Sequence, residues 1–207
     1  MRRTVKAAAR QGVSVLTLFA FSSDNWGRPR EEVDTLLALF EKYLSLEMGR
    51  CLANGIRLRV IGRRDRLPAS LQLRIARAEA RAAGGTRMLL RIAVDYSGRD
   101  AILAAAEGRG AGTGREDFAE ALARVIHGGE ARDVDLVIRT GGEQRLSDFL
   151  LWESAYAELY FTDRMWPDFD GDDLAKALEW FRGRERRFGR IEETSPPLEM
   201  LAGMRAR

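Results

Sequence analysis

The segment DLVIRTGGEQRLSDFLLWESAYAELYF (Asp135–Phe161) is the part of this sequence that decides its fold. A short apolar run, Leu136–Ile138, is followed by a Thr-Gly-Gly turn and by residues that we predict to form a helix, Asp148–Ala155. A second apolar run then opens with Glu158. Strand, helix and strand in this order are typical of an α/β fold with a parallel sheet.

The same alternation continues through most of the chain, which predicts an α/β domain with a mainly parallel central sheet flanked by helices. We expect one domain over residues 1–190 and a flexible tail over residues 191–207. The predicted strands are Val13–Phe21, Ile56–Ile61, Met88–Val94, Val134–Ile138 and Leu159–Thr162. The predicted helices are Arg2–Gln11, Pro29–Ala53, Ala69–Ala83, Arg99–Glu107, Glu116–Ile126, Asp148–Ala155 and Asp172–Arg186.

The composition excludes several classes of function. The 207 residues, 45% of them hydrophobic, are enough to bury one core. A net charge of +3 gives no electrostatic case for binding nucleic acid. Cys51 is the only cysteine, so no intramolecular disulfide can form, and His127 is the only histidine, which excludes zinc sites with several histidines.

The N-terminal sequence superficially resembles a secretory signal, because early arginines precede the apolar run Val13–Phe21. We favour a different interpretation. Gly12 follows a helical pattern as a stop signal, and the apolar run ends at a polar loop instead of a cleavage site of small residues. No other run reaches the roughly 20 apolar residues that a membrane span needs.

Polar residues after the run Leu136–Ile138 form a candidate anion site. Arg139, Arg145 and Ser147 flank flexible glycines, and the fork of an arginine matches phosphate oxygens two at a time. Glycine also lets backbone N–H groups approach an anion closely. Glu158 is a candidate ligand for the Mg2+ that accompanies many diphosphates. These residue types predict a site for a phosphate-rich anion.

A second polar loop, residues 22–28, follows the first predicted strand in the way that residues 140–145 follow a later one. The carboxyl ends of parallel strands share one edge of a sheet, so the two loops can face one crevice. Each loop by itself could be a capped turn that only connects two elements. Two such loops with three arginines between them favour a binding site.

Five segments of the chain, in order, resemble the cis-prenyltransferase family and, within it, the bacterial undecaprenyl diphosphate synthases. They span nearly the whole chain, and the fourth is the most specific. The segments are LTLFAFSSDNWGRPREEV (Leu16–Val33), RLRVIG (Arg57–Gly62), LRIAVDYSGRDAI (Leu90–Ile102), DLVIRTGGEQRLSDFLLWESAYAELYFTDRMWPDF (Asp135–Phe169) and RERRFG (Arg184–Gly189).

The resemblance implies an enzyme that condenses isopentenyl diphosphate with an allylic diphosphate of the farnesyl type. The product would be a long polyprenyl diphosphate with Z double bonds, made for the cell-wall carrier lipid. The resemblance also implies Mg2+ as cofactor and a cytoplasmic homodimer, free or loosely attached to the membrane into which its product partitions. Cations aimed at the departing diphosphate would lower the barrier.

Matched position by position, the resemblance assigns roles to individual residues. Asn25 would be the catalytic residue that organises the reacting diphosphate and the proton lost from C2. Glu158 would help to place Mg2+, and Arg187 would reach toward the site of the partner subunit. The residues that would bind substrate are Ser22, Ser23, Asp24, Trp26, Arg28, Arg139, Arg145, Leu146, Ser147 and Arg187.

An apolar product needs a sheltered path, and four residues resemble the family's tunnel positions. Leu36, Leu39 and Phe40 lie on the wide apolar face of the long predicted helix, and Met88 begins a strand. Met88 would stand at the tunnel floor, where side-chain bulk limits product length. Ordinary core packing is an equally good interpretation for any one of them.

The sequence also departs from the family pattern. Gln144 stands in place of a histidine, Asp148 in place of an asparagine and Asp24 in place of a glutamate. The family's first strand and its aspartate loop for Mg2+ have no counterpart in the sequence. We therefore expect an exposed strand edge and little condensing activity from the 207 residues by themselves.

Three interpretations follow. The chain could be an active prenyltransferase whose start has been misassigned, or a catalytically deficient truncated or partner subunit of a cis-prenyltransferase dimer. It could also be an unrelated phosphate-binding α/β protein. The last is disfavoured, because the sequence has neither a Walker-type loop nor a GxGxxG motif.

Overall fold

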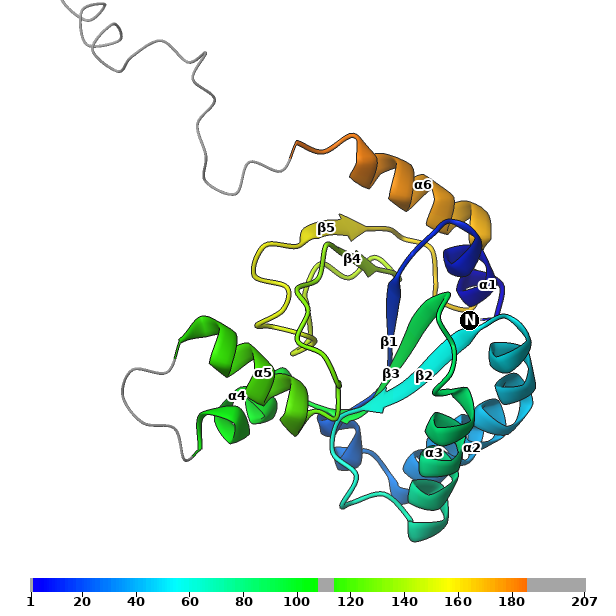
Figure 1. Ribbon diagram of the computed structural model, residues 1–207, viewed down its shortest axis with the longest axis vertical. Helices are drawn as coiled ribbons and strands as arrows, with labels where there is room; N and C mark the ends of the chain where they lie inside the picture. Colours follow the sequence, from blue (N-terminus) through cyan, green and yellow to red (C-terminus); the bar gives the residue numbers. More distant parts are fainter. Residues whose placement is uncertain (1, 108–113, 186–207) are drawn as a thin grey trace, which may run out of the picture.

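The computed structural model describes residues 2–107 and 114–185 (Figure 1). Arg187 and the tail predicted over residues 191–207 lie outside the described residues. The helices are α1 (Arg2–Arg10), the short 3-10 helix η1 (Ser23–Gly27), α2 (Arg30–Ala53), α3 (Ala69–Ala82), α4 (Gly98–Ala106), α5 (Arg115–Val125) and α6 (Gly171–Arg182).

Five strands form where the sequence predicts them, and every pairing between them is parallel. In one sheet, β3 (Met88–Tyr96) lies between β1 (Val15–Ser22) and β2 (Ile56–Ile61). In a second sheet, β4 (Leu136–Arg139) pairs with β5 (Glu158–Phe161). The predicted strands are therefore confirmed, but they are divided between two sheets instead of one.

The central strand β3 is buried along its whole length, because helices cover both faces of its sheet (Figure 1). Leu90, Ile92 and Val94 belong to the core that α2 and α3 also line. Ala93 and Tyr96 belong to a second core with α4 and α5. A mostly apolar sequence is what such a strand requires, and the two charged residues within it, Arg91 and Asp95, are buried as well. Helices on both faces therefore fix the carboxyl end of β3.

The long helix α2 begins and ends as the sequence predicts. Pro29 is its N-cap residue, and the backbone N–H of Asn54 closes the last turn by donating to Arg50 and Cys51 carbonyls. Gly55 follows with φ of +65°, a conformation that glycine adopts without strain.

The helix predicted over Asp148–Ala155 is wrong. Residues 148–155 form a series of turns instead. Ser147, Asp148 and Leu150 all have φ between +47° and +62°, which is incompatible with a right-handed helix. Apolar spacing suggested a helix here, but contacts of these turns with other parts of the fold decide the backbone.

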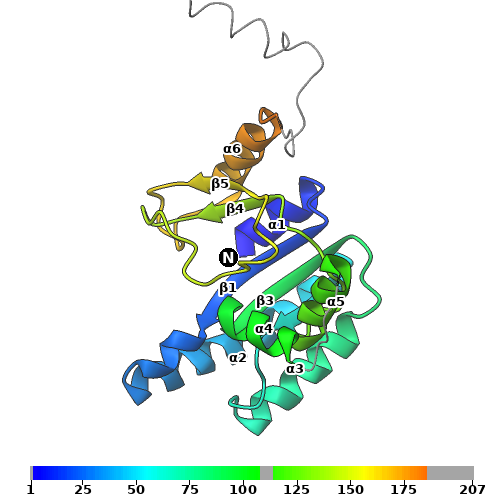
Figure 2. The same ribbon diagram turned by 90° about the vertical axis from the view of Figure 1, so that its left-hand side faces the viewer.

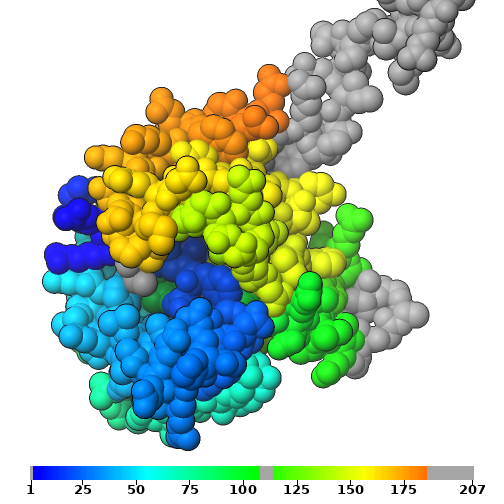
Figure 3. Space-filling view, turned by 180° about the vertical axis from the view of Figure 1, so that it is seen from behind, coloured from blue at the N-terminus to red at the C-terminus, as the bar shows by residue number. Residues whose placement is uncertain are grey.

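A groove of about 640 Å3 separates β1 from β4 and forms a hollow in the surface (Figure 3). Residues of both strands line it. Among the described residues, β1 pairs only with β3 and β4 pairs only with β5, so one edge of each faces the groove without a strand partner. The expected exposed strand edge is therefore present. Because the groove lies between β1 and β4, these two strands do not pair, and the five strands form two sheets.

Helices α1 and α6 pack against each other near the β4–β5 sheet (Figure 2). Thr4 on α1 is buried and donates a hydrogen bond from Oγ1 to the carbonyl of Phe169, 3.1 Å away. No helix in the described part of the chain is both long enough and apolar enough to cross a bilayer.

Gly62 gives a test of how closely the loop after β2 runs against β3. Its φ is +114°, and an added Cβ would lie 2.2 Å from the carbonyl oxygen of Val94. Gly62→Ala should lower the free energy of unfolding by about 2–4 kcal/mol, from backbone strain and overlap together. Chemical denaturation measures the change.

The control is Gly84→Ala, because an added Cβ there meets nothing within 4 Å. This substitution should change the free energy of unfolding by less than about 0.5 kcal/mol. Equal effects at Gly62 and Gly84 would contradict the close approach of the loop to β3.

Candidate functional site

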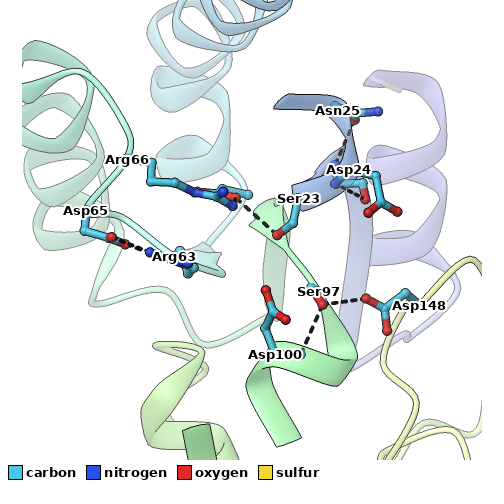
Figure 4. A network of polar contacts seen from close by, with 11 residues as sticks. Ser23, Asp24, Asn25, Arg63, Asp65, Arg66, Ser97, Asp100 and Asp148 are labelled. Atoms are coloured by element: carbon cyan, nitrogen blue, oxygen red, sulfur yellow. Dashed lines mark hydrogen bonds and ion pairs between the residues drawn. The ribbon is translucent and has the colours of Figure 1, made fainter. Parts of the chain in front are cut away.

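The helix η1 follows β1 directly and is closed by its own side chains. Ser22 is its N-cap residue, and the Oγ atom accepts a hydrogen bond from the Asp24 N–H at 3.1 Å. The Asn25 Oδ1 atom accepts from the Ser22 N–H at 2.9 Å. Because the amide oxygen of Asn25 is held in this way, its NH2 group points outward as a donor (Figure 4).

A buried carboxylate lies beneath η1. Asp95 at the end of β3 has no exposed surface, and it accepts a hydrogen bond from the Ser23 hydroxyl at 3.2 Å. Arg66 forms a bidentate ion pair with Asp95. The Arg66 Nε atom lies 2.9 Å from Asp95 Oδ2, and the Arg66 Nη2 atom donates to Asp95 Oδ1. The Arg66 guanidinium also lies 5.5 Å from the centre of the Trp26 ring. Two residues of η1 are therefore attached to one buried charge pair.

The same end of β3 holds the turn that follows Ser147. The Ser97 hydroxyl lies 2.5 Å from Asp148 Oδ2, and the Arg99 N–H donates to Asp148 Oδ1 at 2.9 Å (Figure 4). The Asp148 carboxylate therefore sits at the N-terminus of α4, where a negative charge is favourable. At the one position where an aspartate replaces the expected asparagine, its charge is compensated within the fold.

Stacked aromatic rings connect the two turns between these polar contacts. Phe149 stacks on Phe19 of β1 with ring centres 4.5 Å apart. The ring of Tyr96 meets both of them edge-on. Residues 95–97 thus contact both polar turns. Asp95 contacts Ser23 of η1, and Ser97 contacts Asp148 of the turn after Ser147. One strand end therefore contacts both η1 and the turn at residues 147–149.

The three predicted arginines have different surroundings. Arg28 pairs with Glu32 one turn further along the chain, at 2.6 Å. Arg145 is exposed and forms an ion pair with Glu143. Arg139 ends β4, and its Nε is buried without a hydrogen-bond partner in the described part of the chain. A buried donor without a partner is rare in folded proteins. Of the three predicted arginines, Arg139 is the one with a buried donor that has no partner among the described residues, a feature that Arg64 and Arg91 share elsewhere in the fold.

Glu158, the predicted metal ligand, begins β5, in agreement with its place at the start of the second apolar run. Its Oε2 atom lies 3.1 Å from Nε of Arg184. Within residues 2–107 and 114–185, no group of three or more His, Cys, Asp or Glu side chains could hold a metal ion. These residues do not make a metal cage by themselves. A divalent cation here would need oxygens from a bound phosphate.

The four tunnel residues are not equivalent in the structure. Phe40 and Met88 are buried in the core that α2 and α3 cover, and Leu36 packs against it. Leu39 is 63% exposed on α2. Of the other predicted residues, Asp24 is exposed, Leu146 is half-buried, and Arg187 lies outside the described residues.

Sequence reasoning missed the residues that hold the site together. Asp95, Arg66 and Ser97 were not among the predicted site residues, although Asp95 and Ser97 lie in a segment that resembles the family. One signal was available, because Asp95 is an acidic residue near the end of a mostly apolar run. A charge at such a place must be paired, but the sequence does not say with which arginine.

Comparisons with known proteins match nearly the whole chain. The family model described as "Putative undecaprenyl diphosphate synthase" matches residues 1–189. Isoprenyl transferase 1 of Bradyrhizobium diazoefficiens is 58% identical over 200 residues, which cover 95% of this chain and 79% of that protein. The farnesyl-diphosphate-specific ditrans,polycis-undecaprenyl-diphosphate synthase of Salmonella typhimurium is 48% identical over 198 residues, or 93% and 79%.

Solved structures are similar as well. The lavandulyl diphosphate synthase of Lavandula x intermedia, solved with dimethylallyl diphosphate, has a TM-score of 0.84 and 32% identity. The match covers 91% of this chain and 84% of that one. A probable undecaprenyl diphosphate synthase from Campylobacter jejuni has a TM-score of 0.80 and 31% identity, over 92% and 90% of the two chains.

The family model and the relatives, which match nearly the whole chain, place it in a class of transferases. The chain belongs to the undecaprenyl diphosphate synthase family of isoprenyl transferases, and it is a cis-type prenyltransferase.

The ion pair between Arg145 and Glu143 gives a test of the anion site. Glu143→Gln removes the charge that competes with an anion for Arg145, so inorganic diphosphate should bind about two- to fivefold more tightly. Titration calorimetry without a divalent cation measures the dissociation constant. Glu130→Gln, which removes a similar partner from exposed Arg132, should leave it unchanged. Weaker binding by Glu143→Gln would contradict a role for Arg145.

Proposed function

We propose that this chain binds isopentenyl diphosphate together with an allylic diphosphate of the farnesyl type and joins them repeatedly with Z geometry. The product would be a long polyprenyl diphosphate that serves as cell-wall carrier lipid. The observation that carries the proposal is the pair of polar turns attached to one end of β3, with the Asn25 NH2 group directed outward (Figure 4). The name of the Salmonella relative supports the choice of primer.

In the proposed reaction, C4 of isopentenyl diphosphate forms a bond to C1 of the allylic substrate. The C1–O bond breaks and the diphosphate leaves with the electron pair. C2 of the isopentenyl unit then gives its proton to the departing diphosphate, and the electron pair of the C–H bond forms the new C2–C3 double bond. Asn25 would donate to the diphosphate from its NH2 group. Arg139, Arg145 and Ser147 would hold isopentenyl diphosphate, and the unused buried Nε of Arg139 supports this role. Ser22 and Ser23 would shape the turn, as their hydrogen bonds do here.

The remaining proposed binding residues lie on the same two turns or beyond the described residues. Asp24, Trp26 and Arg28 would complete the wall on the side of η1, and Leu146 would do so beside Ser147. Arg187 would act on the site of a second copy in a homodimer. Leu36, Leu39, Phe40 and Met88 would guide the growing chain. The enzyme would work in the cytoplasm, free or loosely attached to the membrane that takes up its product.

We propose Mg2+ as the cofactor, with Glu158 as a candidate ligand. When bound, the ion would neutralise charge on the diphosphate. Because the described residues supply no cage, the ion would arrive with phosphate oxygens, and Glu158 would have to exchange Arg184 for it. Glu158 and Arg184 would then act as a pair that opens when the substrate binds.

The arginines of the second turn give the direct test. Made in a version of the chain that carries the family's aspartate loop, Arg139→Ala and Arg145→Ala should each raise the KM for isopentenyl diphosphate by roughly 5- to 150-fold, because a lost fork to a diphosphate costs about 1–3 kcal/mol. Steady-state assays with farnesyl diphosphate and labelled isopentenyl diphosphate give the KM. Arg132→Ala is the matched control, since Arg132 pairs with Glu130 outside these turns. An unchanged KM in both variants would remove the assigned role.

A direct binding measurement separates the proposed enzyme from the alternative of a catalytically deficient partner subunit. Calorimetric titration of the 207-residue chain with isopentenyl diphosphate reports binding, and product formation reports turnover. Binding with turnover supports the proposal. Binding without turnover would assign the chain the role of a partner subunit. No binding at millimolar concentration would contradict both.

A further inference from the structure

The geometry points to Arg66 and Asp95 as positioning residues that fix η1, so that the Asn25 amide faces the substrate in one orientation. This inference rests on the proposed role of Asn25. Neither residue belongs to η1: Asp95 lies near the end of β3, and Arg66 lies in the loop that follows β2, so the ion pair joins this loop to the strand. The pair would act through Ser23 and Trp26, without touching the diphosphate.

The first step is that the internal contacts of η1 do not fix its position on the sheet. It has five residues, none of them buried, and a single short 3-10 turn has little stability of its own. Its internal contacts are the cap at Ser22 and the hydrogen bond from the Ser22 N–H to Asn25. These contacts define the shape of the turn but not its place on the sheet. Something outside η1 must attach it.

The second step is that the charge pair attaches η1 at two points on either side of Asn25. Ser23 donates its hydroxyl hydrogen to Asp95 Oδ1 at 3.2 Å. The Trp26 ring packs edge-on against Phe21 and receives the Arg66 guanidinium on its face, 5.5 Å from the ring centre. With the residues at 23 and 26 both fixed, the amide between them has one position.

The third step is that the pair itself is rigid. Asp95 is fully buried and has φ of +51°, and its carbonyl accepts a hydrogen bond from the Arg63 N–H at 3.0 Å. The loop that carries Arg66 leaves β2 at Gly62, whose Cα lies too close to Val94 for any side chain. Leu67, next to Arg66, is 3% exposed. Both partners are therefore anchored in the sheet and not in η1.

The charges that face the pair also favour a single arrangement. Arg66 supplies two donors to the two oxygens of Asp95, and Ser23 supplies a third. In the described part of the chain, the nearby Arg63 is occupied by Asp65, with contacts of 3.1 and 2.6 Å. A buried carboxylate with three donors resists rearrangement, because any move would leave a charge without a partner.

The experiment compares Arg66→Ala with Arg63→Ala, the same change three residues earlier in the same loop. In a proton–nitrogen correlation spectrum, the Asn25 side-chain amide is identified by its loss in Asn25→Ser. The Trp26 indole signal is identified by its loss in Trp26→Phe. Arg66→Ala should shift both signals, whereas Arg63→Ala should leave both in place. Unmoved Asn25 signals in a folded Arg66→Ala variant would overturn the proposal.

Activity supplies a second reading, independent of the first. Arg66→Ala should lower kcat by about tenfold or more, with the KM for isopentenyl diphosphate within twofold of the native value. Added methylguanidinium should restore part of the lost rate, which a loss of folded protein would not allow. A native kcat in a variant with displaced Asn25 signals would contradict the role in catalysis. If the native chain makes no product, the proposed function fails, and the spectra still decide the positioning.

Loss of folding is the remaining risk, and Arg66→Lys guards against it. Lysine keeps a cation near Trp26 but not the fork to Asp95, so this variant should fold and shift the Asn25 signals less than Arg66→Ala does. Thermal melting checks both variants. Unfolding of both would make the pair a general support of the fold and would overturn its specific role at η1.

Discussion

The carboxylate of Asp95, buried at the end of β3, is the interaction on which the arrangement of the site depends. A charge in this place must be paired, and removal of one partner from a buried pair costs about 3–5 kcal/mol. The cost is smaller here because the Arg66 side chain is 35% exposed. The requirement for pairing draws the loop after β2 and the turn after β1 to the same point. Two residues further along the chain, the Ser97 hydroxyl donates a hydrogen bond to the Asp148 carboxylate, which belongs to the turn after Ser147. One strand end therefore organises polar turns that are far apart in the sequence.

Much of the fold could be predicted because its signals are local. The long helix α2 has Pro29 before it and Asn54-Gly55 after it, and the mostly apolar sequence of β3 indicates that this strand is buried. The division into two sheets could not be predicted, since strand composition does not report which edges meet. The turns at 148–155 were mistaken for a helix because apolar spacing does not reveal left-handed backbone, which contacts with β1 and α4 impose.

The candidate site shows the same division between local and distant signals. Ser22 and Asn25 could be found from the sequence, and their hydrogen bonds are made within the turn itself. Asp95 and Arg66 lie 29 positions apart, and their contact exists only in the folded chain. Asp148 stands where the family resemblance leads us to expect an asparagine, so it adds a negative charge at this position. In the structure, this carboxylate accepts hydrogen bonds from Ser97 and from the Arg99 N–H at the N-terminus of α4. These contacts exist only in the folded chain, so the sequence could not reveal them.

The central claim is that the end of β3 makes one site from two turns. A titration with isopentenyl diphosphate, followed in proton–nitrogen correlation spectra, tests this most directly. The account predicts that the Asn25 side-chain amide and the backbone amides of residues 147–149 shift together, with one shared dissociation constant. Shifts confined to one turn, or two different dissociation constants, would show that the turns bind independently and would contradict the account.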